Sequence, residues 1–233
     1  MRRLPDADEF ASQRANMVER QLRRRGITDQ RVLEAMAAIP RERFVPEPYA
    51  RRTYADSALP IGHEQTISQP WIVAAICQAM ELRGSEKVLE VGTGSGYSAA
   101  VLARLAAEVI TIERVPELAD RARAALGDLG IAGVEVVIGD GSAGLPDRSP
   151  FDAIAVHAAA PGPPPTLVTQ LEIGGRLVVP IASRRADMLT VFRRLGETVD
   201  LATGEGLERE VIGPCRFVPL IGTEGFAEER LFL

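Results

Sequence analysis

The sequence predicts an α/β fold with an open, doubly wound and mainly parallel sheet. Three observations lead to this expectation. Strand-like apolar runs alternate with helix-like segments after residue 86, a glycine-rich turn follows the first of these strands, and the 233-residue chain is 46% hydrophobic and 25% charged. Strands and helices at this spacing form right-handed βαβ units, and this composition supports a sizeable buried core.

Residues 1–82 are expected to form a subdomain of helices and loops that joins the sheet in one compact unit. Its predicted elements, in order, are a helix over 10–25 ended by Gly26, a helix from Asp29 to Pro40, a loop over 41–69 and a helix over 70–82. The loop contains three prolines and little periodicity. Connections of this length are usually functional, so we expect part of the site there.

Residues 83–233 are expected to form the sheet domain. The predicted strands cover 87–91, 109–112, 134–138, 151–156 and 176–181, and the predicted helices cover 97–105, 116–129 and 167–171. Two later strand-like runs, 188–195 and 210–221, are expected to pair at the sheet edge. The chain is therefore expected to have a Rossmann-like sheet with additional C-terminal edge strands.

The glycine-rich turn lies where open α/β sheets bind ligands, at the carboxyl end of the first strand. The strand ends at Glu90 and Val91 and continues as Gly92-Thr93-Gly94-Ser95-Gly96-Tyr97. The spacing is GxGxG, and Tyr97 takes the position at which a dinucleotide fingerprint has its third glycine. A carboxylate at Glu90 suits a ligand that carries an ammonium and a sulfonium better than one that carries phosphates.

Two further acidic residues follow the next two strands. Glu113 can accept hydrogen bonds from ribose hydroxyls, and Asp140 from an adenine amino group. Each feature alone also fits an ordinary turn or a solvated cap, but their conjunction predicts S-adenosylmethionine binding. The expected cofactor-binding residues in this part of the chain are Glu90, Gly92, Gly94, Gly96, Glu113, Asp140 and Gly141.

Charge, cysteine and histidine content narrow the expected partners. A net charge of -5 argues against a basic surface for nucleic acid, and two cysteines outside any CxxC pair fit a reducing compartment. His63 and His157 are the only histidines and do not have metal-ligand spacing. The acidic residues that follow Pro5 disfavour a secretion signal, and the prolines that interrupt the apolar run from Ala153 to Leu171 disfavour a membrane span. We therefore expect a cytoplasmic protein with no nucleic-acid, membrane or metal partner.

Several motifs outside the glycine turn recur in one known family. They include Pro40-Arg41-Glu42-Arg43-Phe44-Val45-Pro46, Gln65-Thr66-Ile67-Ser68-Gln69-Pro70 and Phe217-Val218-Pro219-Leu220. With these motifs the chain resembles the protein-L-isoaspartate O-methyltransferases over essentially its whole length. The Gln65 to Pro70 motif is specific to this family, whereas many methyltransferases share the glycine turn.

The resemblance implies an enzyme that uses S-adenosylmethionine to esterify L-isoaspartyl carboxylates in damaged proteins and peptides, with D-aspartyl residues as a further candidate substrate. It implies that Ser68 is the active-site serine and that Thr66 and Ser68 close over the cofactor. Ile61 and Gly62 are implied as substrate contacts. From the residues alone, Ser68 also fits a helix cap just before Pro70, and both roles can hold together.

The implied chemistry needs few catalytic groups. A carboxyl with a pKa near 4 is already ionised at pH 7, so no general base is required. Displacement at the sulfonium methyl requires mainly positioning, which Ser68 and backbone amides would provide. The resemblance further implies that the methyl ester cyclises to a succinimide, whose hydrolysis returns some normal aspartate and so repairs the chain.

Two residues depart from the family pattern. Glu64 stands where the family commonly has glycine, and it either points to solvent or narrows specificity by repelling anionic ligands. His157 stands where the family usually has threonine, and it either contacts substrate or packs a loop. These two residues leave open a methyltransferase dedicated to an aspartate of one partner peptide. A cofactor-binding module without turnover is a further alternative of a different class.

Methyltransferases that act on nucleic acids are disfavoured by the residues themselves. The segment after the fourth strand reads Ala158-Ala159-Ala160-Pro161-Gly162 and lacks the Asn/Asp-Pro-Pro-Tyr motif of amino-methyltransferases. A C5-pyrimidine methyltransferase needs a nucleophilic cysteine, whereas Cys77 and Cys215 lie in apolar runs expected to be buried.

Overall fold

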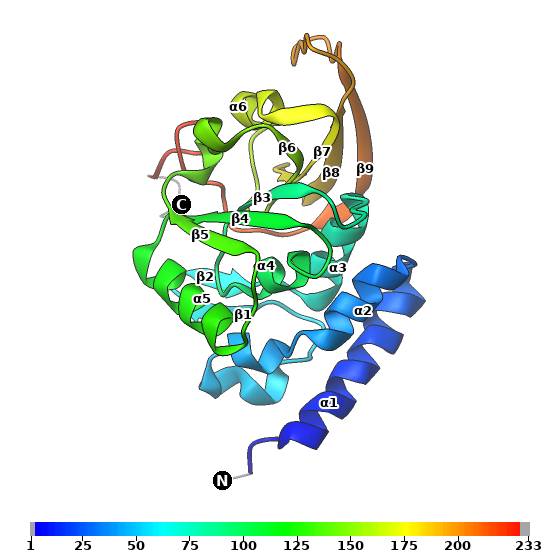
Figure 1. The fold of residues 1–233 in the computed structure, drawn as a ribbon, viewed down its shortest axis with the longest axis vertical. Helices are drawn as coiled ribbons and strands as arrows, with labels where there is room; N and C mark the ends of the chain where they lie inside the picture. Colours follow the sequence, from blue (N-terminus) through cyan, green and yellow to red (C-terminus); the bar gives the residue numbers. More distant parts are fainter. Residues whose placement is uncertain (1–2, 229–233) are drawn as a thin grey trace.

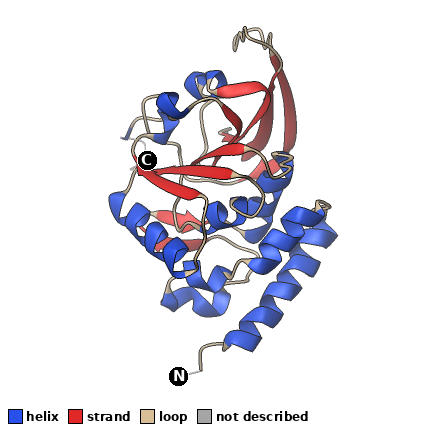
Figure 2. Ribbon diagram, viewed as in Figure 1, coloured by secondary structure: helices blue, strands red, loops and turns tan. Residues whose placement is uncertain are grey.

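A seven-stranded sheet forms the central layer of the computed structural model, which describes residues 3–228 (Figures 1 and 2). The strand order is β5-β4-β3-β6-β7-β8-β9. The strands are β3 (Lys87–Val91), β4 (Glu108–Glu113), β5 (Val134–Ile138), β6 (Phe151–Val156), β7 (Leu171–Ile181), β8 (Asp187–Arg194) and β9 (Leu207–Cys215). Strands β3 to β7 pair in parallel, whereas β8 pairs antiparallel with both β7 and β9. The mainly parallel sheet confirms the predicted fold class.

The order in which the chain adds strands to the sheet changes sides at β3. It runs outward from β3 through β4 to β5 and then returns to the other side of β3 as β6. In this register Val91 pairs with both Ile112 and Val156, so the carboxyl ends of the three strands lie side by side. Ligands of open α/β sheets bind at such a switch point.

Alternate strand residues face two separate hydrophobic clusters because successive side chains point to opposite sides of a sheet. On one face, Val88 and Val109 belong to the cluster that includes α2 (Gln30–Ala38), α3 (Pro70–Ala79), α4 (Tyr97–Leu102) and α5 (Pro116–Asp128). On the other face, Leu89 and Ile110 pack in a cluster with α6 (Pro165–Thr169). Helices on both faces make the sheet doubly wound.

The N-terminal helix begins earlier than its apolar pattern predicts. Asp6 and Glu9 form a capping box that starts α1 (Ala7–Asn16), and the helix continues through a π-helical stretch and a 3₁₀ turn to Gly26, whose φ is 90°. Figure 1 shows α1 along the outside of the molecule, far from the projecting β8–β9 hairpin. The hydrophobic cluster that contains Val88 and Val109 also contains side chains that precede residue 82 in the chain. The boundary at residue 82 between an N-terminal subdomain and the sheet domain stays a prediction.

The segment 41–69 is more regular than its sequence suggests. Two 3₁₀ turns (Arg41–Phe44 and Glu47–Arg52) precede an antiparallel hairpin of β1 (Leu59–Gly62) and β2 (Gln65–Ile67). Its two turn residues, His63 and Glu64, both have positive φ, at 52° and 59°, as a type I′ turn requires. Sequence reasoning missed the hairpin because its strands are very short and its turn lacks the usual Asn-Gly pair.

The last predicted strand also differs from the structure. We expected strand over 210–221, but β9 ends at Cys215 and the chain then turns back across the sheet, where Ala159 bridges to Pro219. Within residues 3–228, no helix is long and apolar enough to cross a membrane. The same residues contain no group of three or more His, Cys, Asp or Glu side chains that could hold a metal ion.

Candidate active site

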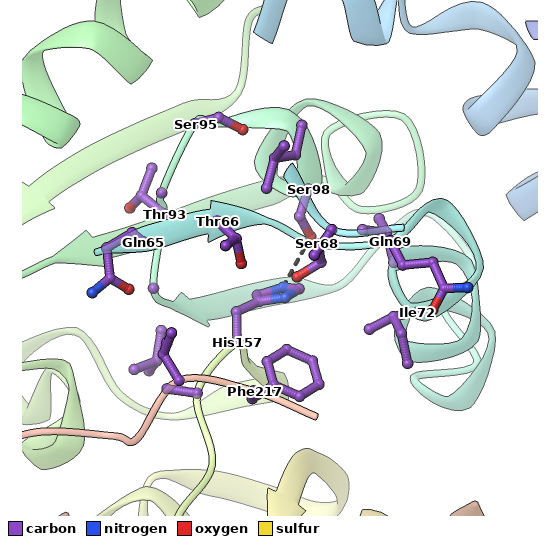
Figure 3. Close-up of a pocket in the computed structure, with 18 of the residues that line it drawn as sticks. Gln65, Thr66, Ser68, Gln69, Ile72, Thr93, Ser95, Ser98, His157 and Phe217 are labelled. Carbon is purple, nitrogen blue, oxygen red and sulfur yellow. Dashed lines mark hydrogen bonds between the residues drawn. The ribbon is translucent and has the colours of Figure 1, made fainter. Parts of the chain in front are cut away.

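A cavity of about 590 Å³ lies at the carboxyl ends of β3, β4 and β6. Figure 3 shows its labelled side chains: Thr66 and Ser68 come from β2 and the segment after it, Thr93 from the glycine turn, His157 from beyond β6 and Phe217 from the C-terminal segment. The predicted site residues that line the cavity are Thr66, Ser68, Gly92, Gly94, Glu113, Gly141 and His157. Those that do not are Ile61, Gly62, Glu90, Gly96 and Asp140.

The glycine turn packs tightly against α5. Gly96 has a φ of 86° and caps α4 in the left-handed region, which favours glycine. A Cβ at Gly96 would lie 3.2 Å from Cβ of Ala122, so this glycine also permits close packing of the two helices. Gly92 and Gly94 face the cavity instead, where their main chain is accessible to a ligand.

Glu113 fixes the glycine turn to the end of β4. Its Oε2 accepts from the backbone N–H of Gly94 at 2.8 Å, and its Oε1 accepts from that of Val115 at 3.0 Å. The residue is 5% exposed and lines the cavity. Because each carboxylate oxygen has a second lone pair, this geometry leaves acceptor capacity for ribose hydroxyls.

The carboxylate of Asp140 already accepts hydrogen bonds from other residues of the chain. It accepts four hydrogen bonds, from the N–H and hydroxyl of Ser142 and from the N–H and hydroxyl of Thr223. Burial raises the pKa of Asp140, but the hydrogen bonds from Thr223 and Ser142 outweigh it, so the pKa is lowered overall. Four bonds fill the usual acceptor capacity of a carboxylate, so an adenine amino group would have to replace one of these donors.

Glu90 is fully buried beneath the cavity wall. Its Oε2 accepts from the hydroxyl of Thr111 at 2.6 Å, and this hydroxyl lies 2.6 Å from that of Thr93. Its Oε1 lies 3.2 Å from Nε2 of His157. The contact with an ammonium that we predicted for Glu90 stays a prediction, because here its partners are protein side chains.

His157 joins this buried carboxylate to the cavity. Its Nε2 lies 2.9 Å from the hydroxyl of Ser98, and both residues line the cavity. Ser98, His157 and Glu90 together contain the groups of a hydrolytic triad. However, Ser98 and Glu90 approach the same ring nitrogen, whereas a triad uses one nitrogen for each partner. The arrangement is therefore not that of a nucleophilic triad.

Ser68 lies in the cavity wall just before α3. Its carbonyl accepts from Nη2 of Arg41 at 2.8 Å, and the next side chain, Gln69, donates to Oδ1 of Asp56 at 2.5 Å. The N-cap residue of α3 is Gln69, and no side chain caps this helix. The helix-cap role that the sequence also allowed for Ser68 is therefore wrong, and its hydroxyl is available to a ligand.

Ile61 and Gly62 hold the hairpin in place rather than facing the cavity. The carbonyl of Ile61 accepts from Nη2 of Arg121 on α5 at 2.7 Å, and Cδ1 of Ile61 lies 3.4 Å from where a Cβ of Gly94 would be. Gly62, with a φ of 92°, leads into the exposed turn. Glu64 in that turn is exposed and is not part of the cavity lining.

The geometry agrees with comparisons with known proteins. The family model described as "Protein-L-isoaspartate(D-aspartate) O-methyltransferase (PCMT)" matches residues 12–225. The chain belongs to this family. A relative from Rhodopseudomonas palustris strain HaA2, named protein-L-isoaspartate O-methyltransferase 1, is 52% identical over 95% of this chain and 88% of its own length. One from Syntrophus aciditrophicus is 50% identical over 94% and 99%.

Solved structures of similar proteins show the same fold. A protein-L-isoaspartate O-methyltransferase superposes with a TM-score of 0.78 at 30% identity, covering 91% of this chain and 66% of that one. A Plasmodium falciparum protein, solved in complex with S-adenosyl-L-homocysteine, superposes with a TM-score of 0.74 at 23% identity over 92% and 99% of the two chains.

In this family member, the C-terminal segment lines the cavity in a way that the sequence did not predict. The N–H of Phe217 donates to Oδ2 of Asp187 at 2.9 Å, and Ala159 exchanges backbone hydrogen bonds of 2.8 Å with Val218 and Leu220. These contacts place residues 214–221 over the carboxyl end of β6. Pro214 and Pro219 were the available signals, because proline disfavours the interior of a strand.

Proposed function

We propose that this chain transfers the methyl group of S-adenosylmethionine to the free carboxylate of L-isoaspartyl residues in proteins and peptides. The observation that carries the proposal is that Ser68 from the family-specific motif and the glycine turn line one cavity. The cavity volume of about 590 Å³ is typical of small-molecule sites. Family membership supports both the reaction and the cofactor.

The residues around the cavity fit the proposed cofactor. Glu113 offers a fixed carboxylate at the end of β4, where ribose hydroxyls can donate to it. Gly92 and Gly94 let the main chain approach the ligand, while Phe217 and Leu220 add apolar surface. When bound, S-adenosylmethionine would supply a methyl group on a sulfonium: a substrate carboxylate oxygen would bond to the methyl carbon as the carbon–sulfur bond breaks, giving a methyl ester and S-adenosylhomocysteine.

The chain's own residues need only to bind and orient the two reactants. The isoaspartyl carboxylate is ionised at neutral pH and needs no base to remove a proton. The Ser68 hydroxyl can donate to one carboxylate oxygen and leave the other to attack the methyl carbon in line with the breaking carbon–sulfur bond. The segment 214–221 lines the same cavity and would shield the bound reactants from part of the solvent.

The biological consequence that we propose is repair of damaged protein. The methyl ester cyclises to a succinimide without further catalysis, and hydrolysis of the ring returns part of the chain to normal aspartate. D-aspartyl residues are a second proposed substrate, in keeping with the description of the family. We also propose a cytoplasmic location, which the two free thiols, Cys77 and Cys215, support.

Matched peptides that contain either aspartate or isoaspartate at one position test the proposal. Each peptide is incubated with methyl-labelled cofactor, and base-labile methyl ester is measured as released methanol. We expect ester on the isoaspartyl peptide and none on its aspartyl partner. Ester on the aspartyl peptide alone would indicate a dedicated peptide methyltransferase. Binding of S-adenosylhomocysteine without ester on any peptide would indicate a binding module.

A further inference from the structure

Arg41 is a fully buried cation that contacts the segment carrying Ser68. Its side chain is 0% exposed, and burial lowers its pKa to about 10, so the guanidinium stays protonated at neutral pH. Two main-chain carbonyls accept its hydrogen bonds. Nε donates to Thr53 at 2.9 Å, and Nη2 donates to Ser68 at 2.8 Å. A single side chain at the start of the segment 41–69 therefore contacts both its middle, at Thr53, and its end, at Ser68.

The same guanidinium lies over the helix that follows the glycine turn. Its central carbon is 4.9 Å from the centroid of the Tyr97 ring, a distance at which a cation is attracted to an aromatic face. Tyr97 is the first residue of α4 and directly follows Gly96. Arg41 thus bridges Ser68 and the beginning of α4, so its geometry determines how far Ser68 lies from the glycine turn.

Stability alone does not account for this arrangement. Nη1 of Arg41 is buried and has no hydrogen-bond partner among the described residues. A buried charge without a carboxylate partner costs free energy, and so does an unpaired buried donor. An apolar side chain of similar volume would avoid both costs. The arginine does provide a planar fork that reaches two carbonyls while its face rests on an aromatic ring.

We infer that Arg41 is a positioning residue for the methyl transfer, holding Ser68 at a fixed place relative to the glycine turn. The inference rests on the proposed function, because Ser68 would orient the substrate carboxylate and the glycine turn would hold the cofactor. Transfer requires the attacking oxygen about 3 Å from the methyl carbon, and a displacement of about 1 Å can cost about 100-fold in rate. Arg41 acts through Ser68 and does not line the cavity.

The Arg41→Lys variant tests this inference. Lysine keeps the charge but has a single nitrogen in place of the planar fork whose Nε and Nη2 bond the two carbonyls, and it has no planar face to lie over Tyr97. We expect kcat on an isoaspartyl peptide to fall at least tenfold, while the Kd for S-adenosylhomocysteine changes less than twofold. Arg31→Lys is the matched control, because Arg31 also donates to two carbonyls, those of Leu82 at 2.6 Å and Leu105 at 3.0 Å, away from the cavity. Its kcat should change less than twofold.

A double-variant comparison separates positioning from general loss of structure. In the Ser68→Ala background, Arg41→Lys should lower kcat less than threefold, because the hydroxyl that Arg41 positions is already absent. An equal loss in both backgrounds would contradict the inference. So would an Arg41→Lys variant that retains its kcat, or one whose Kd for S-adenosylhomocysteine rises as much as its kcat falls.

A second variant covers the case in which Arg41→Lys does not fold. Replacing the peptide N–H of Gln69 by an ester oxygen weakens the Ser68 carbonyl as an acceptor and keeps every side chain. We expect the same loss of kcat with unchanged Kd, and an unchanged kcat would contradict the inference. A wild-type chain that forms no methyl ester on any peptide contradicts the proposed function and the inference together. An active wild type with a variant of unchanged kcat contradicts the inference alone.

Discussion

Nε2 of His157 lies 3.2 Å from Oε1 of Glu90, a carboxylate that is 0% exposed. Glu90 Oε1 has no hydrogen-bond partner among the described residues, whereas its Oε2 accepts from the hydroxyl of Thr111. The imidazole of His157 is therefore the polar contact of a buried oxygen that no hydrogen bond satisfies. His157 is thus a cavity-lining residue that also contacts a buried side chain of the interior.

Replacing His157 by alanine should lower the free energy of unfolding by about 2 kcal/mol, because it removes the polar group that lies 3.2 Å from a buried carboxylate oxygen that no hydrogen bond satisfies. Urea unfolding of both proteins measures the change. Glu90→Gln in the same background provides the control: a neutral amide is cheaper to bury than a carboxylate, so part of the loss should be recovered. If the double variant is no more stable than His157→Ala, the pair does not act as described.

Ser68→Ala should lower kcat on an isoaspartyl peptide by about tenfold or more, the effect expected when one oriented hydrogen-bond donor is removed. The Kd for S-adenosylhomocysteine, measured by calorimetry, should change less than twofold. Ser85→Ala removes an exposed hydroxyl outside the cavity lining and should behave like wild type. A Ser68→Ala variant with normal kcat would remove Ser68 from the proposed mechanism.

Glu64→Gly should raise the free energy of unfolding by about 1 kcal/mol, because Glu64 has a φ of 59°, which a residue with a Cβ adopts at a cost. Glu64→Ala removes the charge but keeps the backbone cost, so it should bring no such gain. Because Glu64 is exposed and outside the cavity lining, neither change should alter the ranking of aspartyl and isoaspartyl peptides. A changed ranking in both variants would show that the charge narrows specificity.

Asp140→Asn should destabilise the protein by about 1 kcal/mol at neutral pH, because hydrogen bonds to a carboxylate are stronger than those to an amide. The folded-state pKa of Asp140 is lower than its ordinary value of 3.8, so its contribution is fully present above that value. It is lost as the pH falls through the lower, folded-state pKa. Urea unfolding of wild type and variant should therefore differ at pH 7, and the difference should shrink as the pH is lowered below 3.8. A constant difference would contradict this assignment.

Local sequence patterns predicted most of the fold because the central strands are apolar runs and several helices bury an apolar face. The strands β3 to β6 begin and end within a residue of their predicted limits. The N-terminal helix extends further because its start depends on the capping pair of Asp6 and Glu9, which lies outside the apolar pattern. The β1–β2 hairpin depends on its packing against Gly94 and Arg121, which no local pattern records.

The sequence predicted some residues of the candidate site and missed others, because some depend on local strand ends and others on tertiary contacts. Residues that follow directly from a strand end, such as Gly92, Glu113 and His157, line the cavity where expected. Phe217 was missed as a site residue, because its position depends on a backbone fold-back after β9. Arg41 was recognised only as part of a family motif, because its contact with Ser68 forms when a distant loop returns to it.

The sequence by itself determined the order of strands and helices, the glycine turn and the placement of acidic residues at successive strand ends. Parallel strands bring these ends to one edge of the sheet, so local pattern is sufficient to predict a shared site. Only the tertiary structure decided that Arg41 donates to the carbonyl of Ser68, that His157 lies against Glu90, and that Thr223 donates to the carboxylate of Asp140. These contacts join residues far apart in the chain, and their geometry depends on how whole elements pack.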